Sequence, residues 1–108
     1  MQKIVKIVSI LSIVGVLSTG ASAASFNCAK ASNSIEHAIC NDKELNALDG
    51  KMGKLYHKIH SKNWRDQHRN MVKMRNEQAE NYRDPTKFLL KWTKEEIKEL
   101  ERQVRLGG

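Results

Sequence analysis

Apolar residues recur at spacings of three and four along most of the chain beyond residue 33, which is the pattern of an amphipathic helix. No segment alternates apolar and polar residues for long enough to predict a β-strand. The clearest stripe predicts a helix over about residues 42–61; it consists of Leu45, Leu48, Met52, Leu55 and Ile59. Two further stripes predict helices over about residues 64–82 and 85–105. The first comprises Trp64, His68, Met71, Arg75, Gln78 and Tyr82, and the second Phe88, Leu89, Trp92, Ile97, Leu100 and Val104.

Residues that favour helix starts precede the first of these stripes. Asn33 is followed three residues later by Glu36, which resembles a capping box and predicts a short helix over residues 34–40. Either Asn41 or Asp42 caps the helix that follows. The short helix therefore leads directly into the long one.

The last helix has a start signal in Asp84-Pro85, because aspartate is favoured at the N-cap and proline at the first helical position. Thr93 with Glu96 resembles another capping box, which allows a kink or break near Trp92. Together the stripes and caps predict an all-α fold. It is a small bundle or hairpin of three long helices with a short helix at its N-terminal end.

Two glycines, Gly50 and Gly53, lie inside the predicted 42–61 helix, where each costs up to about 1 kcal/mol relative to alanine. Two interpretations stay open. The missing side chains let a neighbouring helix approach closely, or glycine is tolerated on the solvent-facing side.

The first 23 residues have the features of a secretory signal peptide. Lys3 and Lys6 supply the positive start, residues 7–17 form a short apolar core, and Ala21-Ser22-Ala23 has the small residues that a signal peptidase requires. The alternative is a retained transmembrane anchor, but the last six residues of the stretch are small or polar. We expect cleavage near Ala23, with Ala24 as the neighbouring option.

Export predicts a periplasmic or secreted protein of residues 24–108, with no transmembrane segment after cleavage. A lipid anchor requires a cysteine directly after the cleavage site, whereas Cys28 follows Ser25-Phe26-Asn27. Removal of residues 1–23 takes away two lysines and no acidic residue, so the net charge falls from +7 to +5. A chain of this length forms one domain.

The chain contains two cysteines, Cys28 and Cys40, and export places them in an oxidising compartment. Only one pairing is available, and the closed loop of about 13 residues gives an expected stabilisation of roughly 3 kcal/mol. A redox pair is the alternative, but the separation is far from C-x-x-C. We expect a structural disulfide.

Residue sets for catalysis, metals and cofactors are weak or missing in the sequence. His57 and His60 are three apart on a predicted helix, but they lack a carboxylate at ligand spacing, so solvated histidines are favoured. The sequence contains no G-x-S-x-G, Gly-rich phosphate loop or H-E-x-x-H. Ion pairs on a solvated helix face explain the acidic cluster, which comprises Glu95, Glu96, Glu99 and Glu101 beside Lys94, Lys98 and Arg102. We therefore predict no enzyme, no cofactor and no metal.

Basic residues are frequent along the second predicted helix and the start of the third: Lys51, Lys54, Lys58, Lys62, Arg65, Arg69, Lys73 and Arg75. Such charge can bind phosphate groups or other anionic polymers. An exported protein rarely meets nucleic acid, so no nucleic-acid partner is expected. The alternatives are a solvated basic face or a surface for anionic envelope polymers.

The first third of the predicted mature chain resembles a known family. Its motifs are Phe26-Asn27-Cys28-Ala29-Lys30-Ala31, then Glu36-His37-Ala38-Ile39-Cys40, then Leu45-Asn46-Ala47-Leu48-Asp49, followed by Leu55-Tyr56. In order and spacing they are similar to the lysozyme inhibitor LprI N-terminal domain family, over residues 25–56. The chain departs from that pattern by lacking a second cysteine pair and a lipid-attachment cysteine.

The resemblance implies a small helical, non-catalytic binding protein that occludes a lysozyme or another envelope protein. Animal lysozymes are basic, so a protein of charge +5 is repelled at long range and needs good local fit. An inhibitor of this charge would reach the catalytic carboxylates with a basic side chain near a helix end, for which Lys30, Lys43 and Arg65 are candidates. The rival interpretation is a small envelope module that binds an anionic surface or a protein partner without inhibiting lysozyme.

Overall fold

The computed structural model describes residues 24–107. The predicted signal peptide, residues 1–23, lies outside the described residues. Along the described chain follow a 3-10 helix, η1 (Cys28–Lys30), and four α-helices: α3 (Ser34–Asn41), α4 (Lys43–His57), α5 (Lys62–Ala79) and α6 (Thr86–Arg105). No strand occurs between residues 24 and 107. The all-α prediction is therefore confirmed.

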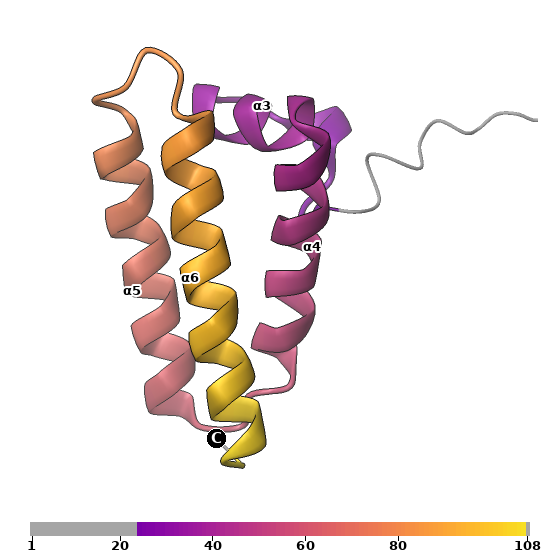
Figure 1. The fold of residues 1–108 in the computed structure, drawn as a ribbon, viewed down its shortest axis with the longest axis vertical. Helices are drawn as coiled ribbons and strands as arrows, with labels where there is room; N and C mark the ends of the chain where they lie inside the picture. Colours follow the sequence, from indigo (N-terminus) through magenta and orange to yellow (C-terminus); the bar gives the residue numbers. More distant parts are fainter. Residues whose placement is uncertain (1–23, 108) are drawn as a thin grey trace, which may run out of the picture.

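The three long helices lie along the longest axis of the molecule, and α3 crosses one end of them (Figure 1). Helices α4 and α6 run parallel, because Glu44 pairs with Lys94 at 3.1 Å and Lys51 pairs with Glu101 at 3.3 Å, seven residues further along both helices. Helix α5 runs in the opposite direction. The α4–α6 contact is the largest between any two described helices, so α6 is the central helix of the bundle.

Two groups of buried apolar side chains hold the helices together. The first lies where α3 crosses the bundle and consists of Ile35, Ile39, Leu45, Ala79 and Leu89. The second lies nearer the other end and consists of Met52, Ile59, Ile97 and Leu100, with the two tryptophans packed against it. Every member of the second group lies on an apolar stripe that the sequence shows.

The helix starts follow the capping pattern. Asn33 Oδ1 accepts from the Glu36 backbone N–H at 2.9 Å, and Asp42 Oδ1 accepts from that of Leu45 at 2.8 Å. Of the two candidate caps for α4, the structure therefore selects Asp42. Ser61 caps α5 in the same way.

Helix α4 ends at His57, four residues before the predicted end at 61. The backbone N–H groups of Lys58 and Ile59 bond to the carbonyls of Leu55 and Tyr56, three residues back, and this tight turn closes the helix. Ile59 still lies in the core because the turn directs it inward, which is why its spacing extends the apolar stripe beyond the helix.

The start of α6 differs by one residue from the prediction: Pro85 occupies the N-cap position and the helix begins at Thr86. The Asp84 carboxylate accepts from the backbone N–H of Thr86 at 3.1 Å and from its hydroxyl at 2.7 Å. The helix then continues without a break near Trp92. Thr93 is only 1% exposed, so it packs inside the bundle and does not cap a new helix.

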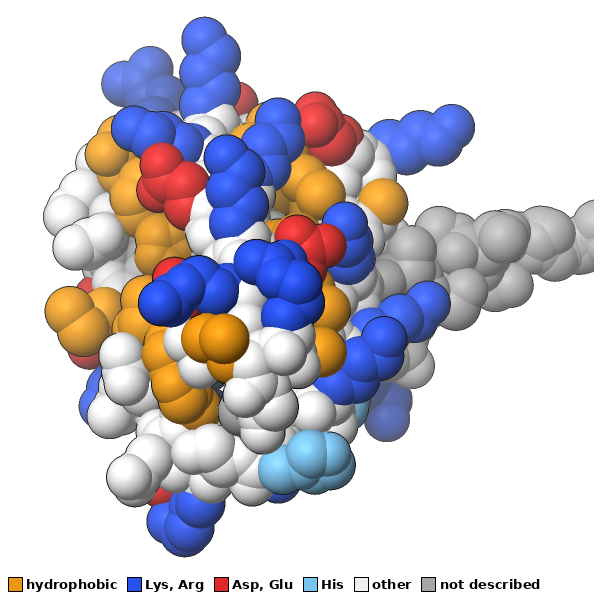
Figure 2. All heavy atoms as spheres, turned by 60° about the horizontal axis from the view of Figure 1, so that its bottom comes forward, with side chains coloured by type: hydrophobic (Ala, Val, Ile, Leu, Met, Phe, Trp, Pro, Cys, Tyr) orange, Lys and Arg blue, Asp and Glu red, His pale blue; other side chains and the backbone are white. Residues whose placement is uncertain are grey.

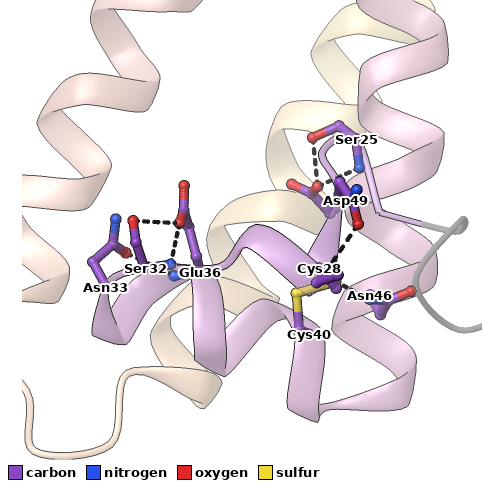
Figure 3. Close-up of a disulfide and its surroundings, with 10 residues drawn as sticks. Ser25, Cys28, Ser32, Asn33, Glu36, Cys40, Asn46 and Asp49 are labelled. Atoms are coloured by element: carbon purple, nitrogen blue, oxygen red, sulfur yellow. Dashed lines mark hydrogen bonds between the residues drawn. A yellow bond between two sulfur atoms is a disulfide. The ribbon is translucent and has the colours of Figure 1, made fainter.

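The predicted disulfide is present. Cys28 and Cys40 are joined with their Cα atoms 5.8 Å apart, and no cysteine of the described residues is free. Asn46 Nδ2 donates to Cys28 Sγ at 3.4 Å (Figure 3). The bridge therefore fixes η1 to the last turn of α3 and places both beside α4.

Candidate functional site

A groove of about 580 Å³ lies between α4 and α5. Helices α4 and α5 form its sides, α3 and the segment before η1 line it at one end, and α6 lies between the two long helices (Figure 1). Its lining combines apolar with charged side chains. Within this lining Phe26, Ile39, Met52 and Val72 are apolar, and Asp49, His68, Arg69, Lys73 and Arg75 are polar or charged.

Asp49 anchors the N-terminal segment at the groove. Its Oδ2 accepts from the Ser25 backbone N–H at 2.8 Å and from the Ser25 hydroxyl at 2.5 Å (Figure 3). A Cβ atom on Gly53 would lie 2.9 Å from Ser25 Cβ, too close for two carbons. Gly53 therefore permits a close approach, although the approaching segment is the non-helical stretch before η1 and not a helix.

His68 and Glu96 form a buried polar contact between α5 and α6. The Nδ1 atom of His68 lies 2.6 Å from Glu96 Oε2, and the side chains are 7% and 4% exposed. The assignment of Glu96 to a solvated ion-pair face was therefore wrong. Glu99 and Glu101 do lie on that face, paired with Arg102 at 3.0 Å and with Lys51 at 3.3 Å.

Arg75 is also buried, with only 5% of its surface exposed. Its Nε and Nη2 atoms donate to Asn76 Oδ1 at 2.9 and 2.6 Å, and its guanidinium lies 5.2 Å from the centre of the Trp92 ring. Burial lowers the pKa of Arg75, and the negative charge of Asp49 partly offsets that effect. The prediction that Arg75 continues a basic surface was wrong.

Tyr56 lies at the side of the groove beside two arginines of α5. Its hydroxyl accepts from Arg69 Nη1 at 2.9 Å, and the Arg65 guanidinium lies 5.7 Å from its ring centre. Burial alone would raise the pKa of Tyr56, but the hydrogen bonds and charges of the two arginines outweigh it and lower the pKa. Arg69 also pairs with Asp66, which lies beside it on α5.

The basic residues do not form one continuous face. Lys51 pairs with Glu101, Lys62 pairs with Asp66, and Lys58 lies beyond the end of α4. On the face seen in Figure 2, blue basic side chains are interspersed with red acidic and orange apolar ones. Within residues 24–107, the basic residues of this set that make no ion pair and stay exposed are Lys54, Lys58, Arg65 and Lys73.

The histidine pair weighed as a metal site is at the exposed end of α4. His57 is the last residue of that helix, and His60 lies in the connection to α5. Among the described residues, no three or more His, Cys, Asp or Glu side chains come together in a way that would hold a metal ion.

The groove does contain a serine, an aspartate and histidines, but in a different order from a hydrolase triad. In a triad the serine hydroxyl bonds to the histidine, and the histidine bonds to the acid. Here the Ser25 hydroxyl donates directly to Asp49, while His68 bonds to Glu96. Both acids are therefore engaged in contacts between structural elements.

The three basic residues considered for partner contact lie at opposite ends of the molecule. Lys30 ends η1 and Lys43 begins α4, so both lie near the end that α3 crosses, here called the α3 end. Arg65 lies in the first turns of α5, at the other end (Figure 1). All three are exposed. The structure does not bring them together.

Arg83 is a further candidate contact residue that was not predicted from the sequence. This exposed residue lies in the connection between α5 and α6, which projects at the α3 end (Figure 1). A shallow hollow of about 440 Å³ separates it from α3 and is lined by His37, Asn41 and Asp42. The sequence does indicate its position, because Arg83 directly precedes the Asp84-Pro85 helix start and therefore lies in the connection before it.

None of the helices within residues 24–107 has the length and apolar character needed to cross a membrane. Comparison of the chain with protein-family models, curated proteins and solved structures finds no match. The similarity to the lysozyme inhibitor LprI N-terminal domain family therefore stays a prediction that rests on the motifs of residues 25–56.

Proposed function

We propose that the protein is an exported, non-catalytic binding protein that acts by occluding a partner, and that lysozyme is the partner to test first. The motifs within residues 25–56 support this proposal. Several of their side chains hold the fold together, as Cys28, Cys40 and Asp49 illustrate, so we place the partner surface outside these residues. The observation that carries the proposal is the ordered, exposed loop that presents Arg83.

The loop around Arg83 is anchored on both sides. The Tyr82 ring stacks on Phe88, with ring centres 5.1 Å apart and planes inclined by 20°. On the other side, Asp84 bonds to the backbone and hydroxyl of Thr86. Because its neighbours are held, Arg83 is presented on a preformed turn, which reduces the ordering entropy lost on binding.

An arginine on such a turn suits a cleft that contains carboxylates. Its planar guanidinium donates two parallel hydrogen bonds to a carboxylate. Within the described residues, Arg83 makes no ion pair that would compete. In lysozyme, two catalytic carboxylates flank the scissile bond. Contact with them would block substrate access and offset part of the repulsion between two basic proteins.

The test is residual muramidase activity of animal and bacterial-type lysozymes in the presence of the exported, oxidised protein. We expect dose-dependent inhibition that Arg83→Glu weakens at least tenfold. Arg105→Glu is the matched control, because Arg105 is exposed in the last turn of α6, at the far end of the bundle. Full activity of every lysozyme at large molar excess would overturn the inhibitor proposal.

A second candidate is an envelope module that binds an anionic surface. The observation that favours it is that four basic residues of α4, α5 and the connection between them are exposed and make no ion pair within the described residues: Lys54, Lys58, Arg65 and Lys73. Binding to anionic vesicles would then fall steeply with salt, because it depends on released counterions and screened charge. Lys58→Glu would weaken that binding more than Arg83→Glu, whereas lysozyme inhibition would respond to Arg83→Glu alone.

A further inference from the structure

We propose that the groove between α4 and α5 binds a small amphipathic carboxylate, whose anionic group is received by Arg75 and whose apolar part lies on the apolar lining. This site is separate from the loop of Arg83 and does not depend on lysozyme binding. Arg75 has hydrogen-bond donors that no described residue accepts.

A guanidinium has five N–H groups and no acceptor, so a buried arginine normally has a carboxylate or several carbonyl oxygens around it. Arg75 is only 5% exposed, yet its only hydrogen-bond acceptor among the described residues is Asn76 Oδ1. Its Nη1 atom donates to none of the described residues. Among the described residues, every fully enclosed side-chain N or O atom except Thr93 Oγ1 has a hydrogen-bond partner. Because Arg75 Nη1 has no partner, it is not fully enclosed, and it reaches the groove that Arg75 lines.

The acidic groups around the groove are already engaged. The negative charge of Asp49 raises the pKa of Arg75, but the hydrogen bonds that Asp49 accepts come from Ser25. Glu36 of α3 accepts from Ser32, and Glu96 of α6 bonds to His68. Three basic side chains line the groove against two acidic ones, and Arg75 Nη1 has no acceptor among the described residues, which favours an anionic ligand over a cationic one.

Further positive charge lies on the α5 side of the groove. Lys73 is exposed and has no ion pair among the described residues, and Arg69 lies one turn before it. These side chains would attract an anion toward Arg75 at long range. On the α4 side the groove is lined by His57 as well as Asp49.

The rest of the lining suits an apolar body. Ile35 and Ile39 of α3, Met52 of α4 and Val72 of α5 all border the groove, together with Phe26. A volume of about 580 Å³ falls within the range of small-molecule sites, which are mostly apolar with a few placed polar groups. A carboxylate with a chain of about eight carbons would meet both parts of this lining.

The experiment is isothermal titration of the exported, oxidised protein with octanoate, 1-octanol and butyrate. We expect saturable binding of octanoate at least tenfold tighter than of 1-octanol, which lacks the charge, and of butyrate, which lacks the apolar length. Arg75→Met keeps an unbranched apolar side chain but removes the guanidinium, and it should weaken octanoate binding at least tenfold. The matched control Arg105→Met, exposed in the last turn of α6 and outside the groove lining, should leave it within twofold.

The same titrations contain the outcomes that would overturn the proposal. No binding of octanoate by the unmodified protein would do so, as would equal affinity for 1-octanol. If Arg75→Met does not fold, as judged by helical circular dichroism, Val72→Trp is tested instead. The indole ring would occupy the groove while leaving Arg75 in place. Octanoate binding unchanged by a folded Arg75→Met, or by a folded Val72→Trp in its place, would exclude this groove.

Discussion

His68 Nδ1 lies 2.6 Å from Glu96 Oε2, and this contact joins the middle of α5 to the middle of α6 inside the bundle. Arg75, two turns further along α5, stacks on Trp92 of the same partner helix. Helix α5 is thus held to the bundle in part by polar side chains, whereas α4 packs on α6 through Met52, Leu100 and other apolar residues.

The first prediction concerns His68. His68→Ala leaves Glu96 buried without its partner, so we expect the free energy of unfolding to fall by about 3–5 kcal/mol. His57→Ala, at the exposed end of α4, should change it by less than about 0.5 kcal/mol. Urea unfolding followed by circular dichroism measures both.

A double variant separates the contact from simple loss of packing. His68→Leu with Glu96→Leu replaces both polar groups by apolar ones, so it should recover much of the stability lost in His68→Ala. Equal losses in the His68 and His57 variants would contradict the structural role of this pair.

The second prediction concerns the Cys28–Cys40 bridge. Replacing Cys28 by serine should lower the free energy of unfolding by about 2–4 kcal/mol, because the unfolded chain regains the freedom of the closed loop. Reduction with dithiothreitol should have the same effect on the unmodified protein and none on a variant with both cysteines replaced. Thiol titration of the unfolded, unreduced protein should find no free sulfhydryl.

The third prediction distinguishes the two candidate caps of α4. Asp42→Ala removes the acceptor for the Leu45 backbone N–H and should cost about 0.5–2 kcal/mol. Asn41→Ala is the control, since Asn41 is exposed at the end of α3 and should change stability by less than about 0.5 kcal/mol. A larger loss of stability for Asn41→Ala than for Asp42→Ala would show that Asn41, and not Asp42, caps α4.

The fourth prediction is a pH dependence. Hydrogen bonds from the Thr86 hydroxyl and backbone lower the pKa of Asp84 below its ordinary value of 3.8. A depressed pKa contributes stability that is present above the ordinary pKa and is lost as the pH falls through the lower, folded-state value. The stability difference between the unmodified protein and Asp84→Asn should therefore be constant near neutral pH and shrink below about pH 4.

Thermal unfolding between pH 2 and 7 measures this difference. Asn81→Ala, in the same connection, is the control, and its difference from the unmodified protein should not vary with pH. A difference for Asp84→Asn that grows on acidification would reverse the sign and contradict the assignment.

The helices and the core followed from the sequence because local signals and burial agree there. Leu45 and Leu100 lie on apolar stripes and are fully buried. The end of α4 was placed too late because Ile59 keeps the helical spacing while its backbone has already left the helix. Apolar periodicity reports which side chains are buried, not which hydrogen bonds the backbone makes.

The groove could not be predicted in the same way, because its residues come from segments far apart in the chain. His68 and Arg75 did occupy the inner stripe of the third predicted helix, and polar residues at such positions signal buried partners. The partners themselves, Glu96 and Trp92, depend on how α5 crosses α6. The hydrogen bond between Ser25 and Asp49 joins residues 24 positions apart, so no local sequence pattern predicts it.

The polar attachment of α5 also bears on how the molecule fluctuates. Native proteins open in cooperative units, and the least stable unit is the one with the fewest apolar contacts to the rest. Of the two helices that flank α6, α5 makes the smaller contact with it, and α4 and α6 pack together without α5. Amide hydrogen exchange should therefore be fastest in α5 and slowest in α6. Detachment of α5 alone would widen the groove while the disulfide-bound part of the molecule stays folded. The same motion would then both admit a ligand and be the first step of local unfolding.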